Sequence, residues 1–335
     1  MNAIIEEASM HGEVLRSCFG KYFDGNGETL AAIKKTFDEE GLNRVIFAGV
    51  GSSYYAPFSV SGLLNGEGIS ASVYNASDLS LNNFNQITEK TLLVCISSSG
   101  STKEIVELAR KAKGIGRIVG IFNKEGSPLD EIADYSLLLH LGSGSVVANK
   151  PFLCMVAVLN VLAHALVGKL NDDFKAECYR AVEWIENWHK NYETNTQPLY
   201  ALAKDARMFD FLADGEGVAT INQTAMVMRE FPKVYTAAKE CADYAHGWYG
   251  CVRPGYLGFI FAPSYQEGST AKRMADQALD RGGKIILFTG SQVEAKEGMA
   301  VVSLPKLRKS LIPLMEVIPC GTLMGMMVGS DSKKN

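Results

Sequence analysis

The stretch Leu92–Thr102, LLVCISSSGST, joins an apolar run to a string of hydroxyl side chains and one glycine. Residues 103–113 follow with the apolar spacing of a helix. A strand, a polar turn and a helix in this order can build a cradle for a phosphate ester. The hydroxyls and the free N–H groups of the helix start would face the same anion. Gly100 would let the backbone come close to that anion.

The turn lacks the lysine of the GxxxxGKS/T motif. A nucleoside triphosphate bound with magnesium is therefore not expected. A phosphomonoester fits the hydroxyl string better. The alternative left open by these residues alone is a Ser-rich connection that only caps a helix.

Short apolar runs that end in small or polar residues recur along the chain and predict the strands of parallel sheets. A first series begins at Val45, Leu92, Arg117 and Tyr135, and a second begins at Met208, Gly258, Lys284 and Ala300. The offsets between the two series are 163, 166, 167 and 165 residues. An offset this steady is typical of an internal duplication.

We therefore predict an α/β fold with two tandem doubly wound parallel-sheet domains, each an αβα sandwich. The expected divisions are a helical N-terminal segment over 1–43, a first domain over 44–170, a helical connector over 171–203 and a second domain over 204–329. Ligands of such sheets bind beyond the carboxyl ends of the strands. Both Gly51-Ser52-Ser53 and Ser97–Thr102 are expected at such ends.

The composition is that of a soluble globular protein, with 47% hydrophobic and 21% charged residues. A formal net charge of -4 with dispersed basic residues argues against a nucleic-acid or membrane-surface partner. The first residues, MNAIIEEASMHGEVLRSCFG, lack the apolar region of a signal peptide, so we expect a cytoplasmic protein. The apolar stretches 151–168 and 311–329 are interrupted by polar residues and prolines and are expected to be buried helices.

Cysteine and histidine spacings do not predict a metal site or a disulfide framework. The seven cysteines are scattered, odd in number and never spaced as CxxC, which favours reduced thiols. The five histidines show no HxxxH or HExxH spacing. We expect no metal and no organic cofactor.

Glu230 is the first acid–base candidate. Residues 219–231 have helical spacing and Pro232 ends the helix, so Glu230 lies in its last turn. The helix dipole opposes a negative charge there, which would raise the pKa of this carboxyl and suit a general base. The alternative is a solvated carboxylate paired with Arg229 or Lys233.

His246 is the second candidate, in the segment HGWYG. A histidine flanked by aromatic residues can be a proton shuttle or a stacked structural residue. Glu240 and Asp243, which lie between the two candidates, have similar formal claims.

Four separated segments carry a family resemblance in the right order. They are GVGSSYYA at Gly49–Ala56, ISSSGSTKE at Ile96–Glu104, VVANKPF at Val146–Phe152, and Phe211–Gly247 with FLADG, AMVMRE and AHG. Together they resemble the SIS (sugar isomerase) family of phosphosugar-binding domains. Over nearly its whole length the chain is similar to the isomerase half of glucosamine-6-phosphate synthase and to fructosamine-6-phosphate deglycases.

The resemblance implies a role for each matching residue. Ser97, Ser98, Ser99 and Thr102 would hold the phosphate, and Gly51, Ser52, Ser53 and the backbone near Val146 would surround the sugar. Glu230 would move a proton between C1 and C2 of the open-chain sugar. His246 would open the sugar ring from the neighbouring subunit, which implies a homodimer.

Departures from the synthase pattern bear on the expected reaction. Val227 stands where the synthase carries a lysine, and neither its lysine-bearing C-terminal tail nor its glutaminase domain is expected here. The resemblance therefore favours a deglycase that converts a 6-phosphofructose-amine into glucose 6-phosphate and free amine. The alternatives are an aldose–ketose isomerase or a deaminase/isomerase of hexose or hexosamine phosphates, and a non-catalytic phosphosugar-binding regulator. EGSTAK at Glu267–Lys272 echoes SGSTKE and is interpreted as a relic rather than a second anion site.

Overall fold

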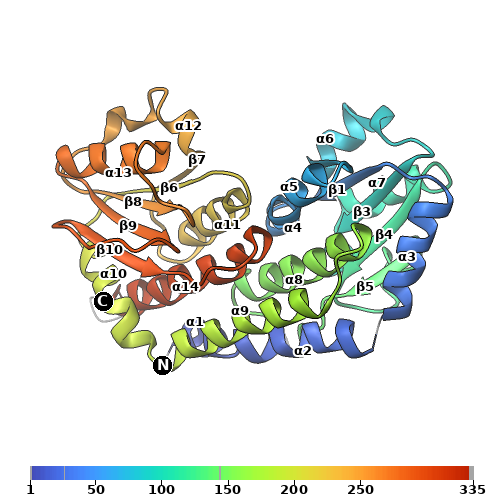
Figure 1. The fold of residues 1–335 in the computed structure, drawn as a ribbon, viewed down its shortest axis with the longest axis horizontal. Coiled ribbons are helices and arrows are strands. Elements are labelled where there is room, and N and C mark those ends of the chain that lie inside the picture. The colour runs from blue at the N-terminus through green and yellow to red at the C-terminus, as the bar shows by residue number, and fades with distance from the viewer. Residues whose placement is uncertain (1, 26, 143–144, 332–335) are drawn as a thin grey trace. The chain divides into compact units, whose positions relative to one another are not determined.

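The computed structural model describes residues 2–25, 27–142 and 145–331. The chain divides into two compact units, which we call the first unit (Glu13–Tyr179) and the second unit (Met1–Gly12 with Arg180–Asn335). Each unit contains one five-stranded parallel sheet with helices on both faces (Figure 1). This is the α/β class predicted from the alternation of strands and helices.

The sheet of the first unit has the order β2-β1-β3-β4-β5. Its strands are β1 (Arg44–Gly49), β2 (Ser70–Asn75), β3 (Thr91–Ile96), β4 (Arg117–Phe122) and β5 (Tyr135–Leu138). All four neighbouring pairs are parallel. Every residue of β3 is buried, because helices cover both faces of a parallel sheet.

Helices of the first unit separate into two layers. Its helical segments are α2 (His11–Asp24), α3 (Gly27–Glu39), α4 (Ser52–Tyr55), α5 (Phe58–Gly66), α6 (Ala76–Leu81), the 3-10 turn η1 (Phe84–Gln86), α7 (Lys103–Ala112), α8 (Asn149–Leu166) and the start of α9 (Asp172–Lys190). Side chains of α6 and α7 form one core with alternate residues of β1 and β3. Helices α3 and α5 pack with α8 on the other face.

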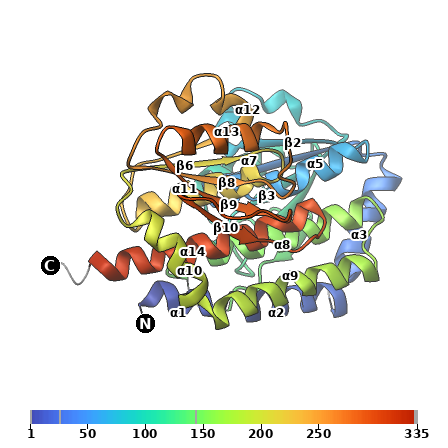
Figure 2. The same cartoon turned by 60° about the vertical axis from the view of Figure 1, so that its left-hand side comes forward.

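The second sheet repeats this arrangement in the order β10-β9-β8-β6-β7. Its strands are β6 (Met208–Ala213), β7 (Thr236–Glu240), β8 (Tyr256–Phe261), β9 (Lys284–Thr289) and β10 (Met299–Ser303). As β1 lies between β2 and β3, so β6 lies between β7 and β8. The strand order therefore reverses at corresponding places in the two sheets. Figure 2 shows the strands β8, β9 and β10 of the second sheet from another side.

Helices of the second unit also form two layers. They are α1 (Ala3–Ser9), α10 (Tyr192–Ala203), α11 (Gly217–Glu230), α12 (Cys241–Tyr244), α13 (Thr270–Asp280), α14 (Ile312–Asp331) and the 3-10 turns η2 (Trp248–Cys251) and η3 (Lys309–Leu311). α12 and α13 share a core with one face of the sheet. α10 and α11 pack with α14 on the other face, as Figure 1 shows.

All eight predicted strands form, but β2 and β7 were not predicted. Each is an outermost strand of its sheet, and most of its residues are only half-buried. Their sequences, SASVYN and TAAKE, consequently lack the apolar run that identifies a central strand.

The compact units differ from the predicted divisions at residues 43, 170 and 203. α3 packs against α8 and β5, so part of the expected N-terminal segment belongs to the first unit. α10, expected in the connector, packs against α14, β9 and β10 and belongs to the second unit. Burial of their apolar faces against the sheets is the physical reason.

Two helical stretches, Asn149–Leu166 and Lys309–Gly329, are long and apolar enough to cross a membrane. Within the protein, 94% of the first stretch and 83% of an 18-residue apolar segment of the second are buried. Each packs over its own sheet, as expected of a core helix. Of the seven cysteines, six are buried and Cys251 is exposed.

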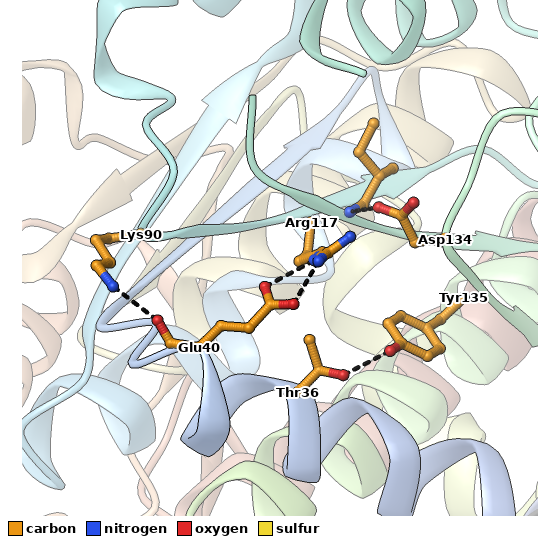
Figure 3. A network of polar contacts seen from close by, with 7 residues as sticks. Thr36, Glu40, Lys90, Arg117, Asp134 and Tyr135 are labelled. Carbon is orange, nitrogen blue, oxygen red and sulfur yellow. Dashed lines mark hydrogen bonds and ion pairs between the residues drawn. The ribbon is translucent and has the colours of Figure 1, made fainter. Parts of the chain in front are cut away.

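A polar network fixes α3 to the amino end of the first sheet (Figure 3). Arg117, the first residue of β4, donates from Nε to Glu40 Oε2 at 2.7 Å, and a second bond makes the pair bidentate. Lys90 donates to the Glu40 carbonyl at 2.7 Å, while the hydroxyls of Thr36 and Tyr135 are hydrogen bonded at 2.6 Å. Arg117 holds the pKa of Glu40 below its usual value. The network lies at the sheet edge opposite to the carboxyl ends of the strands.

Candidate functional site

A pocket of about 490 Å³ lies in the first unit beyond the carboxyl ends of β1 and β3. β1 and β3 are neighbours, but the chain passes from β1 to β2 on one side and from β3 to β4 on the other. Open α/β sheets bind ligands at such a reversal of strand order. The lining residues are Val50, Ser52, Ser53, Ser98, Ser99, Thr102, Asn123, Leu141, Gly142, Ser145, Ala148, Pro151 and Met155. The structure therefore brings together hydroxyl residues from both predicted turns.

The turn after β3 is held by its own hydroxyls. Ser97 is 1% exposed, and its Oγ is hydrogen bonded to Thr102 Oγ1 at 2.7 Å. The N–H and hydroxyl of Ser101 donate to Ser99 Oγ at 3.2 and 2.9 Å. Ser97 consequently lies behind the pocket surface and orients Thr102, whereas Ser98, Ser99 and Thr102 line the pocket.

Gly100 gives this turn its shape. Its φ of 68° is in the left-handed region, which favours glycine. A Cβ atom at Gly100 would lie 2.1 Å from Ser127 Oγ and 2.5 Å from Ser127 Cβ. The Gly100 carbonyl also accepts the Leu129 N–H at 3.0 Å, so the turn is packed directly on the loop after β4.

The turn after β1 requires an equally close approach. A Cβ atom at Gly49 would lie 2.2 Å from both the carbonyl carbon and the oxygen of Ser53. Gly51, with φ 58°, precedes the short helix α4. Ser52 and Ser53 then line the pocket, and Ser53 Oγ contacts Met155 Sδ at 3.7 Å.

Helices α7 and α8 both begin at the pocket. Thr102 is the N-cap of α7, and its side chain makes no capping bond. Ala148, the N-cap of α8, and Pro151 in its first turn are lining residues. At the start of α7 the first N–H groups have no intrahelical acceptor, and the partial positive charge of a helix start favours an anion. The polar side of this pocket is therefore suited to a phosphate group.

Asn123 and Ser145 also line the pocket and were not predicted. Asn123 directly follows β4, its N–H donates to the Ser98 carbonyl at 3.0 Å, and its Oδ1 accepts the Leu141 N–H at 2.9 Å. It thus ties together two lining loops. The rule that ligands lie at carboxyl ends of strands was the signal that would have found it.

Two further predicted residues lie beside the lining rather than in it. Gly51 stands between the lining residues Val50 and Ser52, and Val146 stands one residue after Ser145. The side chain of Val146 is 54% exposed. Their contact with a sugar stays a prediction.

Glu230 is the last residue of α11, as predicted, and its side chain is exposed. Within the described residues it forms no ion pair or hydrogen bond. Arg229, the expected alternative partner, donates instead to the Thr236 carbonyl at 3.3 Å and lies over the Tyr235 ring. Glu230 belongs to the second unit, and its catalytic role stays a proposal.

His246 lies in the turn between α12 and η2 and is exposed. The backbone N–H of His246 donates to the Asp243 carbonyl at 3.0 Å, while the Asp243 carboxylate pairs with Lys239 at 3.2 Å. Lys239 Nζ lies 4.3 Å from the centre of the Trp248 ring. The imidazole is therefore presented at the surface by a turn whose neighbouring charges are already paired.

The fold and the pocket together define an α/β ligand-binding domain with a hydroxyl-lined site at its switch point. Residues 41–165 match the SIS domain family, the family that the sequence resembles. The match covers β1 to β5 and most of α8.

Curated relatives carry the same likeness along most of the chain. It is 24% identical over 323 residues to glutamine–fructose-6-phosphate aminotransferase (isomerizing) of Thermococcus kodakarensis, which is 92% of this chain and 53% of that protein. The enzyme of the same name from Pyrococcus horikoshii is 27% identical over 287 residues, 83% of this chain and 47% of that protein. The chain thus spans about half the length of the curated relatives it matches.

A solved structure shows the same fold. The C-terminal domain of glucosamine-fructose-6-phosphate aminotransferase from Francisella tularensis superimposes with a TM-score of 0.82 and 19% identity. The superposition covers 98% of this chain and 96% of that domain. The fold therefore extends over both units.

Proposed function

We propose that the chain is a phosphosugar isomerase of the SIS family and that its second unit is a further SIS domain. The observation that carries this proposal is the 490 Å³ pocket, where two hydroxyl-bearing turns and the starts of two helices converge. The steady strand offsets and equivalent strand orders support the duplication. The names of the curated relatives support a 6-phosphosugar as the substrate class.

The phosphate of the substrate binds to the turn after β3. Hydroxyls of Ser98, Ser99 and Thr102 donate to its oxygens, and the N–H groups at the start of α7 are further hydrogen-bond donors to the phosphate. Ser97 holds Thr102 in place from behind. Ser52 and Ser53 contact the sugar hydroxyls. Anchoring the phosphate orients carbons C1 and C2 for reaction.

Glu230 moves the proton between adjacent carbons. Its carboxylate removes a proton from one carbon to give a planar enediol or enaminol, and returns that proton to the neighbouring carbon. His246 of the neighbouring subunit exchanges the proton of the ring oxygen, so the ring opens before the transfer. The reaction requires no metal or organic cofactor in this scheme.

A deglycase is the form of this chemistry that we favour. Removal of a C1 proton from a 6-phosphofructose-amine gives an enaminol, and protonation at C2 gives a C1 imine. Water then adds to C1, and cleavage of the C–N bond releases glucose 6-phosphate and the amine. Val227 lies one turn before Glu230 and is buried. Its side chain is aliphatic, so this position supplies no amino group to the reaction.

Turnover of defined substrates tests the proposal. The purified chain is incubated with fructose-6-phosphate–amino acid conjugates, fructose 6-phosphate and glucosamine 6-phosphate, while glucose 6-phosphate and free amine are measured. Glu230→Gln should abolish turnover, whereas the matched variant Glu240→Gln, another exposed carboxylate of the second unit, should retain it. Undiminished turnover in Glu230→Gln contradicts the mechanism. Binding of these phosphosugars without any turnover supports the regulator instead.

Mixing two inactive variants tests the subunit that supplies His246. Glu230→Gln and His246→Asn chains are unfolded together, refolded and assayed. If His246 acts across a dimer interface, each mixed dimer contains one site with both residues intact. About a quarter of wild-type activity is then recovered, because half of the dimers are mixed. No recovery in verified mixed dimers refutes the shared site.

A further inference from the structure

The second unit contains a pocket of its own at the place that corresponds to the site in the first unit. It has a volume of about 460 Å³ and lies beyond the carboxyl ends of β6 and β8, where the strand order reverses. Every lining residue belongs to the second unit. Open α/β sheets bind ligands at this position, and the volume is adequate for a small organic molecule.

The interior of this pocket is apolar. Phe261, Leu304 and Ile312 line it and are 2%, 6% and 4% exposed, and the proline rings of Pro263 and Pro305 add to the same lining. The hydroxyl residues of the lining, Ser264, Ser269 and Thr270, lie apart from this apolar wall, in the loop after β8 and at the start of α13. An apolar wall of this kind favours a ligand with an apolar, ring-sized body.

Cationic and N–H groups lie at the rim. Lys306 and Lys309 are lining residues with exposed side chains, and neither forms an ion pair within the described part of the chain. Thr270 and Ala271 open the helix α13, where N–H groups lack intrahelical acceptors. These groups favour a negatively charged substituent on the ligand.

The acidic lining residues have other roles. Asp214 Oδ1 accepts the Cys241 N–H at 3.1 Å, whereas Glu216 caps α11 through its backbone carbonyl alone, so its carboxylate adds negative charge on the α11 side of the pocket. The first N–H groups of α11 donate to carbonyls of residues 214–216, so they are satisfied by the protein. The anionic part of a ligand is therefore expected on the side of α13 and the two lysines.

A buried carboxyl group lies directly behind the pocket wall. Glu316 is fully buried, and its Oε2 accepts the Thr220 hydroxyl at 2.5 Å, while its Oε1 has no hydrogen-bond partner. A Cβ atom at the lining residue Gly217 would lie 4.0 Å from Glu316 Oε2. Buried polar atoms are nearly always satisfied, so this oxygen points to a hydrogen-bond partner that the chain does not supply.

A neighbouring hollow of about 460 Å³ enlarges the space on the lysine side. It shares Pro263, Ser264, Gly290 and Lys306 with the pocket of the second unit and continues to Ser291 and Gln292. By contrast, Lys272 of the segment EGSTAK pairs with Asp276 at 2.7 Å and Glu267 at 3.3 Å. The anion contact thus falls to Lys306 and Lys309 rather than to the lysine of the repeated motif.

From these observations we propose that the second unit binds a small organic anion, a phosphate or carboxylate ester or acid with an apolar ring-sized body. The ring occupies the space between Phe261, Leu304 and Ile312, and the anionic group faces Lys306 and Lys309. This inference concerns the second unit alone and does not rest on the proposed reaction.

Phenyl phosphate is the probe, because its ring tests the apolar wall and its phosphate tests the two lysines. Calorimetry on the full chain compares it with inorganic phosphate and with phenol. The double variant Lys306→Ala, Lys309→Ala should bind phenyl phosphate roughly tenfold more weakly, as expected for two exposed charges. The double arginine variant should retain binding. Lys296→Ala, an exposed lysine outside this pocket, is the matched control and should bind as the wild type does.

Variants of the first unit distinguish the two pockets. Ser98→Ala with Thr102→Val should leave the Lys306-dependent binding of phenyl phosphate unchanged, because these residues line the other pocket. Circular dichroism confirms that each variant is folded. The proposal is overturned if phenyl phosphate binds no more tightly than inorganic phosphate, if the double alanine variant binds normally, or if only the first-unit variant loses binding.

Discussion

Replacement of Gly100 by alanine tests whether close packing shapes the phosphate-binding turn. The added methyl group would lie 2.1 Å from Ser127 Oγ and 2.5 Å from Ser127 Cβ. Ser127 is 2% exposed, so its side chain has little room to move away. The turn must therefore shift, and with it the lining residues Ser98 and Ser99.

The expected cost has two parts. Placing alanine at φ 68° costs about 1–2 kcal/mol, because the left-handed region disfavours a Cβ atom. Overpacking against Ser127 adds about 1–3 kcal/mol. The free energy of unfolding should thus fall by roughly 2–5 kcal/mol, and the affinity for a 6-phosphosugar should fall as well.

Gly126→Ala is the matched control. Gly126 has φ 69°, but a Cβ atom there meets nothing within 4 Å, so only the conformational part of the cost applies. Adding Ser127→Gly to Gly100→Ala removes the clash and should recover the overpacking part. Urea unfolding and calorimetric titration with glucose 6-phosphate measure both effects. Equal destabilisation by Gly100→Ala and Gly126→Ala would refute the packing argument.

Two other changes probe the backbone and a buried charge. Gly49→Ala places a methyl group 2.2 Å from the Ser53 backbone and should destabilise the first unit by more than about 3 kcal/mol, whereas Gly66→Ala, with open space around it, should be neutral or slightly stabilising in urea unfolding. Burial raises the pKa of Glu316 from 4.5 to about 7, so the folded chain favours its neutral form. The contribution of Glu316 to stability is then fully present below pH 4.5 and falls by about 3 kcal/mol between pH 4.5 and 7; Glu316→Gln should remove this slope, and an unchanged slope would contradict the assignment.

The central strands could be predicted from the sequence because both of their faces are buried. β3 and β8 contain only buried residues and therefore appear as uninterrupted apolar runs. β2 and β7 lie outside β1 and β6 and are half-exposed, so no run distinguishes them from loops. Strand prediction thus depended on an apolar run, which the half-buried edge strand β5 keeps in Leu137 and Leu138 and which β2 and β7 lack.

The candidate site was predictable where hydroxyls follow a recognisable strand. Ser98, Ser99 and Thr102 were found for that reason, and they line the pocket. Asn123 was missed because a single amide after β4 has no distinctive pattern. The inward position of Ser97 was also beyond prediction, since it depends on a side-chain hydrogen bond within the turn.

Helix α11 joins two features of the second unit that the sequence keeps apart. Its first residue, Gly217, lines the second pocket, and its last, Glu230, is the proposed base. A helix of 14 residues is about 20 Å long, so the two features lie at opposite ends of one element. If a ligand in this pocket moved the start of α11, the carboxylate at the other end of the same helix would move with it, and binding would affect the reaction. Turnover measured with and without phenyl phosphate reports this coupling directly.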